Sequence, residues 1–278
     1  MPLTPTDEIV RRARAAGTGV GAFNVLQLEH AQAIVAGAES ADRPVVLQIS
    51  ENTVRYHGAL EPVALASLAI ARAAKTPVAV HLDHAENPDL VREAVGLGLG
   101  SVMFDASKLP YAENVASTRE VVEYCHRHGV WVEAELGEVG GKGGAHTPGV
   151  RTDPDEARAF VAATGVDALA VAVGSSHQML TRDAVLDFAL ITRLRTAVDT
   201  PLVLHGSSGV SDADLTAAIA AGMTKVNVST HLNKAFTRAV RTHLTEHPEA
   251  VDPRHYLTPA RTAVTREVAH LLTVLSPA

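Results

Sequence analysis

The chain contains a single cysteine, Cys125, so an internal disulfide is excluded. A lone cysteine is typical of a reducing compartment, so we expect a cytoplasmic protein in which Cys125 only packs within a helical segment. Long apolar runs are also absent, because stretches such as ALAVAV are far too short to span a bilayer. The first residues, MPLTPTDEIVRRARAAG, carry acidic groups early and no apolar core, unlike a secretory signal.

Clustered positive charge is lacking too. The 24 Lys and Arg residues are scattered and the net charge is −7, which argues against nucleic acid or an anionic membrane as a main partner. Hydrophobic residues make up 46% and charged residues 20% of the 278 positions, as in ordinary globular proteins. This length suits two small domains or one α/β barrel.

Short β-rich runs alternate with longer segments of helical periodicity. They predict strands at residues 19–24, 44–50, 77–83, 100–105, 130–136, 167–174, 201–206 and 225–229. Near-continuous Val, Leu and Ala is typical of strands buried on both faces of a parallel sheet. No Pro-, Gly- or Ser-rich linker separates the runs, which favours one (β/α)8 TIM barrel domain over residues 1–278, with extra terminal helices. A doubly wound sheet stays possible, because the pattern alone does not show closure.

Polar residues gather where the predicted strands end. They are Asp83, His84, Asp105, Glu133, Glu135, His177 and His205. The carboxyl ends of barrel strands meet on one rim, so these side chains are expected to converge there. Neutral imidazole is a usual zinc ligand, and three protein ligands with an open position is the arrangement of catalytic zinc. The pattern therefore predicts a catalytic metal.

Each of these residues also has a structural interpretation. Asp83 would suit the cap of the following helix, and His177 would suit an ordinary loop. Three histidines falling independently on the same rim weakens that interpretation. His81, two residues before Asp83, is predicted to pack or to orient a ligand, whereas histidines in helical or tail patterns, such as His126 and His243, are predicted to lie on the surface.

Two segments of small residues follow the last two predicted strands, HGSSGV at 205–210 and NVSTHLNK at 227–234. Small residues let backbone amides approach an anion, and a helix N-terminus adds a favourable dipole. Barrels often bind phosphate at these two loops. Either segment alone would be an ordinary turn and helix cap, but together they predict a phosphate pocket beside the metal.

A metal beside a phosphate pocket suggests a small phosphorylated substrate that carries a carbonyl. The metal would act on that carbonyl as a Lewis acid and stabilise an enediolate while a C–C bond breaks or forms. Asp83, next in sequence to a predicted ligand, would move a proton to or from the hydroxyl that is made or broken.

Several motifs resemble class II, metal-dependent ketose-bisphosphate aldolases, above all the fructose- and tagatose-bisphosphate branch. They are HLDHA (81–85), VEAELGEVGG (132–141), GSSH (174–177), LHGSSGV (204–210) and NVST (227–230), with AFN at 22–24. The similarity extends over nearly the whole chain. It implies reversible cleavage of a ketose 1,6-bisphosphate to dihydroxyacetone phosphate and an aldehyde such as glyceraldehyde 3-phosphate, in a homodimer or higher oligomer.

The resemblance also implies roles for individual residues. The implied ligands of one catalytic Zn2+ ion are His84, His177 and His205. Asp83 would protonate the aldehyde oxygen during condensation, and Asp105 and Glu135 match a second or alternative divalent position. A monovalent cation would lie near the phosphate. The implied substrate and phosphate residues are Asn24, Ser50, Gln178, Gly206, Ser207, Ser208, Asn227, Val228, Ser229 and Thr230.

Two positions depart from the family pattern. A glutamate that assists proton transfer is expected where Gly143 stands, and a glycine is expected where Gln178 stands. Glu138 or His146, on the glycine-rich segment 137–154 that is predicted to be a mobile loop, could replace the missing acid. Another phosphorylated (deoxy)ketose as substrate, or a sugar-phosphate-binding barrel with impaired catalysis, therefore stays open.

Two other enzyme classes remain alternatives. A class I aldolase needs a Schiff-base lysine inside the barrel, and only Lys225 lies in a predicted strand, near its start and away from the active rim. A sugar-phosphate epimerase or isomerase needs two opposed acid–base groups at one carbon, which Asp83 alone does not supply. The native metal is also open, because imidazole binds cobalt, iron and manganese as well as zinc.

Overall fold

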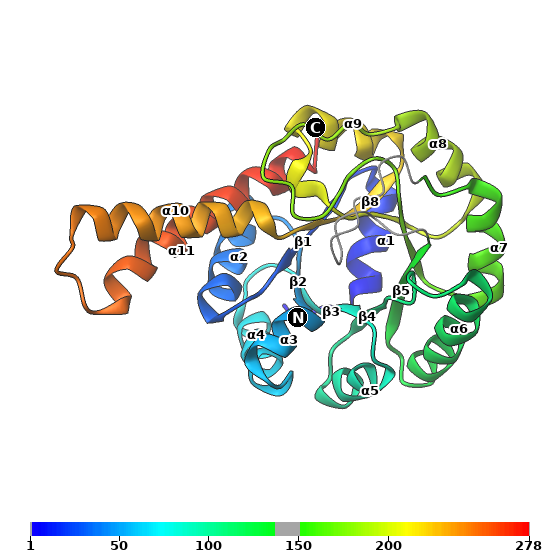
Figure 1. The fold of residues 1–278 in the computed structure, drawn as a ribbon, viewed down its shortest axis with the longest axis horizontal. Helices are drawn as coiled ribbons and strands as arrows, with labels where there is room; N and C mark the ends of the chain where they lie inside the picture. Colours follow the sequence, from blue (N-terminus) through cyan, green and yellow to red (C-terminus); the bar gives the residue numbers. More distant parts are fainter. Residues whose placement is uncertain (1, 137–150, 278) are drawn as a thin grey trace.

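The computed structural model describes residues 2–136 and 151–277, and its strands form a closed, all-parallel barrel (Figure 1). The strands follow one another in chain order and are β1 (Val20–Asn24), β2 (Val45–Ser50), β3 (Val78–Ala85), β4 (Ser101–Phe104), β5 (Trp131–Leu136), β6 (Ala168–Val171), β7 (Leu202–Leu204) and β8 (Met223–Val228). Pairing of β1 with β8 closes the barrel. Closure confirms the predicted (β/α)8 fold and excludes the doubly wound sheet.

Helices surround the barrel and alternate with its strands. They are α1 (Thr6–Ala16), α2 (Leu28–Ala41), α3 (Glu51–His57), α4 (Glu61–Ala73), α5 (Pro88–Leu97), α6 (Tyr111–Arg127), α7 (Pro154–Thr164), α8 (Phe188–Ala197), the 3-10 turn η1 (Ser207–Gly209), α9 (Asp212–Ala221), α10 (Thr230–Glu246) and α11 (Pro253–Val274). Cys125 is buried in α6, as its packing role predicts. Among the described residues, no helix combines the length and apolar composition that crossing a bilayer requires.

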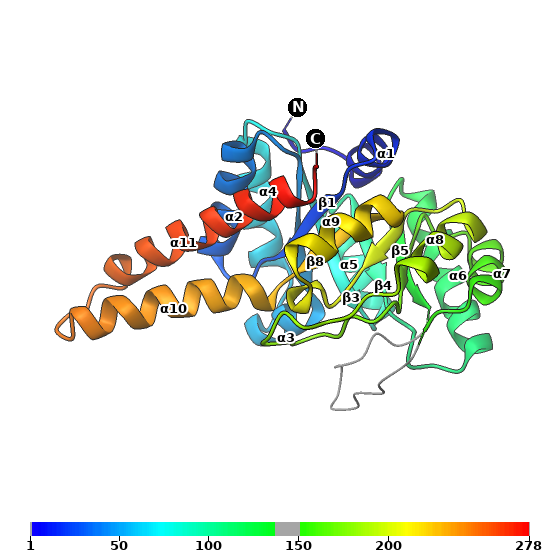
Figure 2. The same cartoon turned by 90° about the horizontal axis from the view of Figure 1, so that it is seen from above.

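Helix α1 closes the barrel at the end where the strands begin, opposite α3 (Figure 2). Its Ile9 packs with Val20, Ala22, Val46 and Ala79. Its Val10 packs with Trp131, Ala168, Ala170 and Val203. Extra terminal helices were predicted, but not that this one fills the end where the strands begin with apolar side chains.

The inward-facing residues change character along each strand, because alternate side chains point to the same face. On β3 the inward residues are Ala79, His81 and Asp83. On β5 they run from Trp131 through Glu133 to Glu135. The barrel interior therefore passes from apolar at α1 to charged at the opposite rim.

Helices α10 and α11 form a hairpin that projects from the barrel in both views (Figures 1 and 2). Helix α11 returns along α2, and Gly37 allows this close approach, because a Cβ there would lie 2.7 Å from the Thr265 carbonyl oxygen. The prediction of a helical C-terminal tail is confirmed by α11.

Four predicted strand boundaries are wrong by two residues or more, and one of them is the end of β7, which lies at Leu204 rather than at 206. Strand β3 continues to Ala85, β6 ends at Val171 rather than at 174, and β8 begins at Met223 rather than at 225. Residues 172–187 contain no helix or strand. Helix α7 already begins at Pro154, the last residue of the segment that was predicted to be a loop. Local apolar composition did not distinguish the ends of β6 from the coil that follows.

Candidate metal centre and active site

The end of β3 departs from regular strand geometry. Its pairing with β4 shifts register between Leu82 and Ala85, and His84 has a left-handed backbone with φ of 50°. A non-glycine residue in this region is strained, and such strain is frequent at functional sites. The shift turns consecutive residues, Asp83 and His84, toward the same cavity. Asp83 does not cap the next helix, since Asn87 accepts the hydrogen bond from the first turn of α5.

Four side chains converge at the rim in the way that a metal site requires. Each of His84, Glu135, His177 and His205 offers a ligand atom, and these atoms all lie within 4.8 Å of one another. The ring centroids of the three histidines are 4.6, 5.2 and 5.7 Å apart. The three predicted histidines therefore share one centre, and Glu135 lies beside them.

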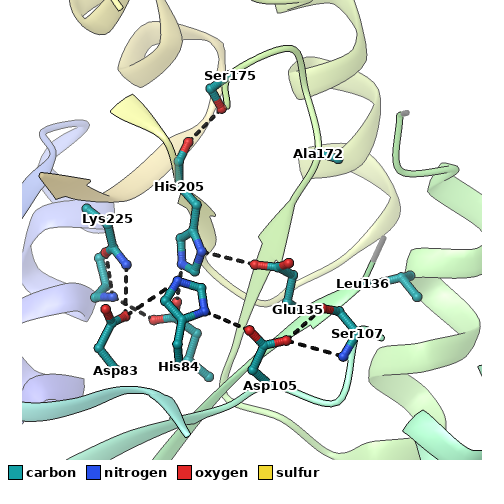
Figure 3. Close-up of polar contacts among 12 residues, drawn as sticks. Asp83, His84, Asp105, Ser107, Glu135, Leu136, Ala172, Ser175, His205 and Lys225 are labelled. Carbon is teal, nitrogen blue, oxygen red and sulfur yellow. Dashed lines mark hydrogen bonds and ion pairs between the residues drawn. The ribbon is translucent and has the colours of Figure 1, made fainter. Parts of the chain in front are cut away.

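Asp105 lies behind this cluster instead of within it. Its Oδ2 is 2.8 Å from His84 Nδ1, and its Oδ1 accepts hydrogen bonds from the backbone and hydroxyl of Ser107 (Figure 3). A carboxylate on one ring nitrogen fixes the orientation of the imidazole and leaves the other nitrogen for a metal. In this geometry Asp105 orients His84, whereas a separate divalent position was predicted for it.

His205 is fully buried between two glutamates. Its Nε2 is 2.9 Å from Glu133 Oε1, its Nδ1 is 3.1 Å from Glu135 Oε2, and Ser175 donates to its carbonyl (Figure 3). Burial would lower the pKa of His205, but the two carboxylates outweigh it and raise the pKa to about 9. The two carboxylates therefore favour positive charge at this position, which either a ring proton or a metal ion bound in its place would supply.

Asp83 is held by side-chain amides. Its Oδ2 accepts hydrogen bonds from Asn24 (3.1 Å) and Gln48 (3.5 Å), and its Oδ1 accepts one from Asn227 (3.3 Å). Burial would raise the pKa of Asp83, but neighbouring imidazoles, that of His84 first, and an ammonium lower it. The carboxylate is therefore ionised at neutral pH, although only 2% of its surface is exposed.

The loops after β7 and β8 meet beside this carboxylate. The Ser207 hydroxyl donates to the Asn227 carbonyl, and Ser208 Oγ accepts from the His231 amide at 3.1 Å. Gly206 has φ of 66°, and a Cβ there would lie 2.5 Å from the Ser176 carbonyl carbon, so no larger residue fits. The two loops predicted to grip phosphate are thus brought together at the start of α10.

One cavity of about 360 Å³ joins these parts. Most of the residues predicted to act at the site line it: Asn24, Ser50, Asp83, His84, His177, Gln178, Gly206, Ser207, Ser208, Asn227, Ser229 and Thr230. Ser50 also caps α3 by accepting from the Thr53 amide. Val228 does not line the cavity, because its side chain belongs to the apolar core.

Three polar residues of the site were missed or misplaced. Gln48 and Glu133 contact Asp83 and His205 but were not assigned roles. The sequence did carry a signal for Gln48 and Glu133. Each is a polar residue within an otherwise apolar strand, as QIS in β2 and VEAEL in β5 show. Lys225 was predicted to lie away from the active rim. Its side chain instead extends inside the barrel toward the rim and reaches Glu133 and Asn227.

Residues 137–150 lie outside the described residues, so the predictions for Glu138, Gly143 and His146 are not tested. The segments on either side of this range meet near the rim. Thr152 donates to the Leu136 carbonyl at 2.9 Å and accepts from the Ala172 amide at 2.8 Å. The Thr152 hydroxyl therefore connects the end of β5 to the residue that follows β6.

The donor set fits a divalent metal. Three imidazoles and one carboxylate are ligands that zinc takes, and iron, cobalt and manganese accept them too. Buried acidic neighbours add a field that attracts a cation. The fold and this cluster define the molecule as a (β/α)8 barrel with a candidate metal centre at the carboxyl ends of its strands.

The family follows from comparison with known proteins. The family model of class II fructose-bisphosphate aldolase matches residues 4–278, so the chain belongs to this family. The crystal structure of the YdjI aldolase from Escherichia coli K12 is 33% identical, with a TM-score of 0.87 and coverage of 98% of this chain and 97% of that one. The fold also matches a Campylobacter jejuni fructose-bisphosphate aldolase at 22% identity, with a TM-score of 0.80 and coverage of 98% and 95%.

Membership in this family supports aldolase activity, which is a lyase reaction, on small sugar-phosphate substrates. The family is generally metal-dependent, in agreement with the cluster of His84, Glu135, His177 and His205.

Proposed function

We propose that the chain is a zinc-dependent aldolase that reversibly cleaves a ketose 1,6-bisphosphate, of the fructose or tagatose type, to dihydroxyacetone phosphate and an aldehyde such as glyceraldehyde 3-phosphate. The main support is the convergence of three imidazoles and Glu135. Two of these imidazoles, those of His84 and His177, line the same cavity as the ionised Asp83. The small-residue loops at the same cavity supply the phosphate end.

His84, His177 and His205, with Glu135, would hold the ion, which supplies Lewis-acid polarisation of a substrate carbonyl when bound. Asp83 then acts as the base for cleavage. Its carboxylate accepts the proton of the hydroxyl that becomes the aldehyde, and it returns this proton to the aldehyde oxygen in condensation. Its lowered pKa keeps the carboxylate ionised at neutral pH, which is the form that accepts a proton.

The phosphate would lie between Gly206, Ser207 and Ser208 on one side and Ser229 and Thr230 on the other. Here the absence of a bulky side chain at 206 lets backbone approach an anion, and the first turn of α10 adds its dipole. A monovalent cation near this phosphate belongs to the same proposal. An alternative divalent position at Asp105 and Glu135 also belongs to it, and its occupation would require Asp105 to release His84.

A Schiff-base mechanism has little support from the geometry. Lys225, the lysine in a strand, donates from Nζ to Glu133 and Asn227 and is fully buried. Both hydrogen bonds occupy its Nζ and Lys225 does not line the cavity, so it is not placed to attack a substrate carbonyl. We further propose that the chain is one domain, is cytoplasmic and forms a homodimer or higher oligomer, with the projecting α10–α11 hairpin as a contact surface.

A panel of phosphorylated ketoses tests this proposal. Each is incubated with the metal-free protein, and then with added Zn2+, and dihydroxyacetone phosphate is assayed. We expect EDTA treatment to abolish cleavage and Zn2+ to restore it, with fructose or tagatose 1,6-bisphosphate as the best substrate. Full activity without metal would contradict the proposal. Cleavage of another ketose phosphate alone would show that the substrate is not a fructose- or tagatose-type bisphosphate.

A further inference from the structure

Lys225 is a buried cation that the proposed proton transfer does not use. It lies on β8 one inward position before Asn227, and its surface is fully buried. Taking an ammonium out of water is costly unless it is well paired. The barrel interior at the α1 end is filled with apolar residues, so closing the barrel does not require a charge at this depth.

The first partner of Lys225 determines how Asn227 points. The lysine Nζ donates to Asn227 Oδ1 at 2.7 Å, and Asn227 Nδ2 donates to Asp83 Oδ1 at 3.3 Å. A carboxamide has one acceptor end and one donor end. With the acceptor end held by the ammonium, the donor end faces the carboxylate. If the group turned over, its carbonyl oxygen would face Asp83 and repel it.

The second partner connects Lys225 to the metal cluster. Glu133 Oε2 accepts from Lys225 at 2.8 Å, and Glu133 Oε1 lies 2.9 Å from His205 Nε2. Asp83, Asn227, Lys225, Glu133 and His205 thus form one buried hydrogen-bonded chain. Lys225 lies at its centre, between the proton carrier and a predicted ligand.

We propose that Lys225 is a positioning residue, which fixes the Asn227 carboxamide so that Asp83 is held in place for proton transfer. This inference rests on the proposed function, because the role of Asp83 does. The Glu133 contact balances the charge of the lysine, and the Asn227 contact transmits its effect to the reacting carboxylate.

Two variants separate these contacts. Lys225→Met removes the ammonium and keeps the length of the side chain, but leaves Glu133 without its countercharge. Lys225→Met/Glu133→Gln removes both charges and retains an acceptor for His205. Lys75→Met, at an exposed lysine, is the matched control. We expect both Lys225 variants to lose about 10–100-fold in kcat, since small misplacements of a reacting group have effects of this size, with KM nearly unchanged.

The test compares the kcat and the melting temperature of the two variants. We expect the double variant to regain most of the melting temperature that Lys225→Met loses, without regaining kcat. If the double variant recovers wild-type kcat, Lys225 serves only to neutralise Glu133 and the proposal is wrong. Normal kcat in Lys225→Met would overturn it as well.

A measurement on the metal-free protein separates this inference from the proposed function. The side-chain amide resonances of Asn227, assigned through their loss in Asn227→Ser, should shift and exchange faster in both Lys225 variants and stay unchanged in Lys75→Met. If wild-type protein cleaves no ketose of the panel, the proposed function fails. Unchanged Asn227 resonances in the Lys225 variants would refute the positioning role independently.

Discussion

The two ends of the barrel differ in what fills them. At the end closed by α1, Ile9 and Val10 pack against small apolar residues and Trp131 of the strands. At the rim, the interior holds carboxylates, imidazoles and an ammonium, and His84 and Gln178 adopt left-handed backbones. Apolar packing stabilises the fold, whereas buried charge and strain oppose it and persist where they perform chemistry. Stability and reactivity are therefore assigned to opposite ends of the same strands.

Two buried histidines show how sharply the interior changes over a short distance. Both His81 and His205 are fully buried. The pKa of His205 is raised to about 9 by Glu133 and Glu135 despite burial, whereas burial and then Lys225 lower the pKa of His81 to about 3. His205 therefore lies where two carboxylates favour positive charge, whereas His81 lies where burial and the Lys225 ammonium disfavour a second cation.

Substitutions at the two ends of the barrel should differ most in their effect on kcat. We expect Asp83→Ala to lower kcat by about 10²–10⁴-fold, as for loss of a general acid–base group, while bound metal stays unchanged. Asp167→Ala is the control, because Asp167 precedes β6 at the opposite end and accepts from the Val132 amide. Kinetics and metal analysis of both variants check this, and normal turnover of Asp83→Ala would reassign the proton transfer.

The converse effect is expected at the apolar end. Ile9→Ala should reduce the free energy of unfolding by about 2–5 kcal/mol, because it deletes buried methylene groups and leaves a cavity. Its kcat should stay near the wild-type value. Urea unfolding and kinetics at 25 °C measure the two quantities. A fall in kcat as large as that of Asp83→Ala would show that the two ends are not separable.

The rim was largely predictable from the sequence, and the interior network was not. His84, His177 and His205 could be brought together because each lies in or shortly after an apolar run that marks a strand, although the end of β6 itself was misplaced. The network under them joins residues that are far apart in sequence, such as Lys225 and Glu133. Only the packing of the barrel shows that these side chains meet.

Two further features also depend on three-dimensional context. The register shift and left-handed backbone at His84 have no local sequence signal, since neither glycine nor asparagine marks them. The contact between Asp105 and His84 depends on that shift. Helix α1 carries a clear amphipathic pattern, but its position across the barrel end follows from where its apolar face finds partners.

The lowered pKa of His81 predicts a pH dependence of stability. Below pH 6.5 the unfolded chain binds a proton at this ring, whereas the folded chain stays neutral down to about 3, so stability falls with falling pH. His81→Asn keeps a partner for Ser101 but does not titrate. We expect the loss of unfolding free energy between pH 7 and pH 5 to be about 2 kcal/mol smaller in this variant.

Urea unfolding of the metal-free protein at the two pH values measures this difference. His255→Asn, at an exposed position, is the control and should leave the pH dependence unchanged. If wild type and His81→Asn lose the same unfolding free energy between pH 7 and pH 5, the His81 ring is protonated in the folded barrel and the prediction is wrong.

The smallest expected effect concerns strain at the rim. Gln178 has φ of 61°, a backbone that favours glycine, and glycine is the residue that the family pattern expects there. Gln178→Gly should raise the free energy of unfolding by about 0.5–1 kcal/mol, since relief of strain exceeds the added freedom of the unfolded chain. Gln32→Gly, inside α2, should instead lower it by about 1 kcal/mol. If both substitutions destabilise equally, contacts of the Gln178 side chain in the cavity outweigh its backbone strain, and the rim is less strained than its geometry indicates.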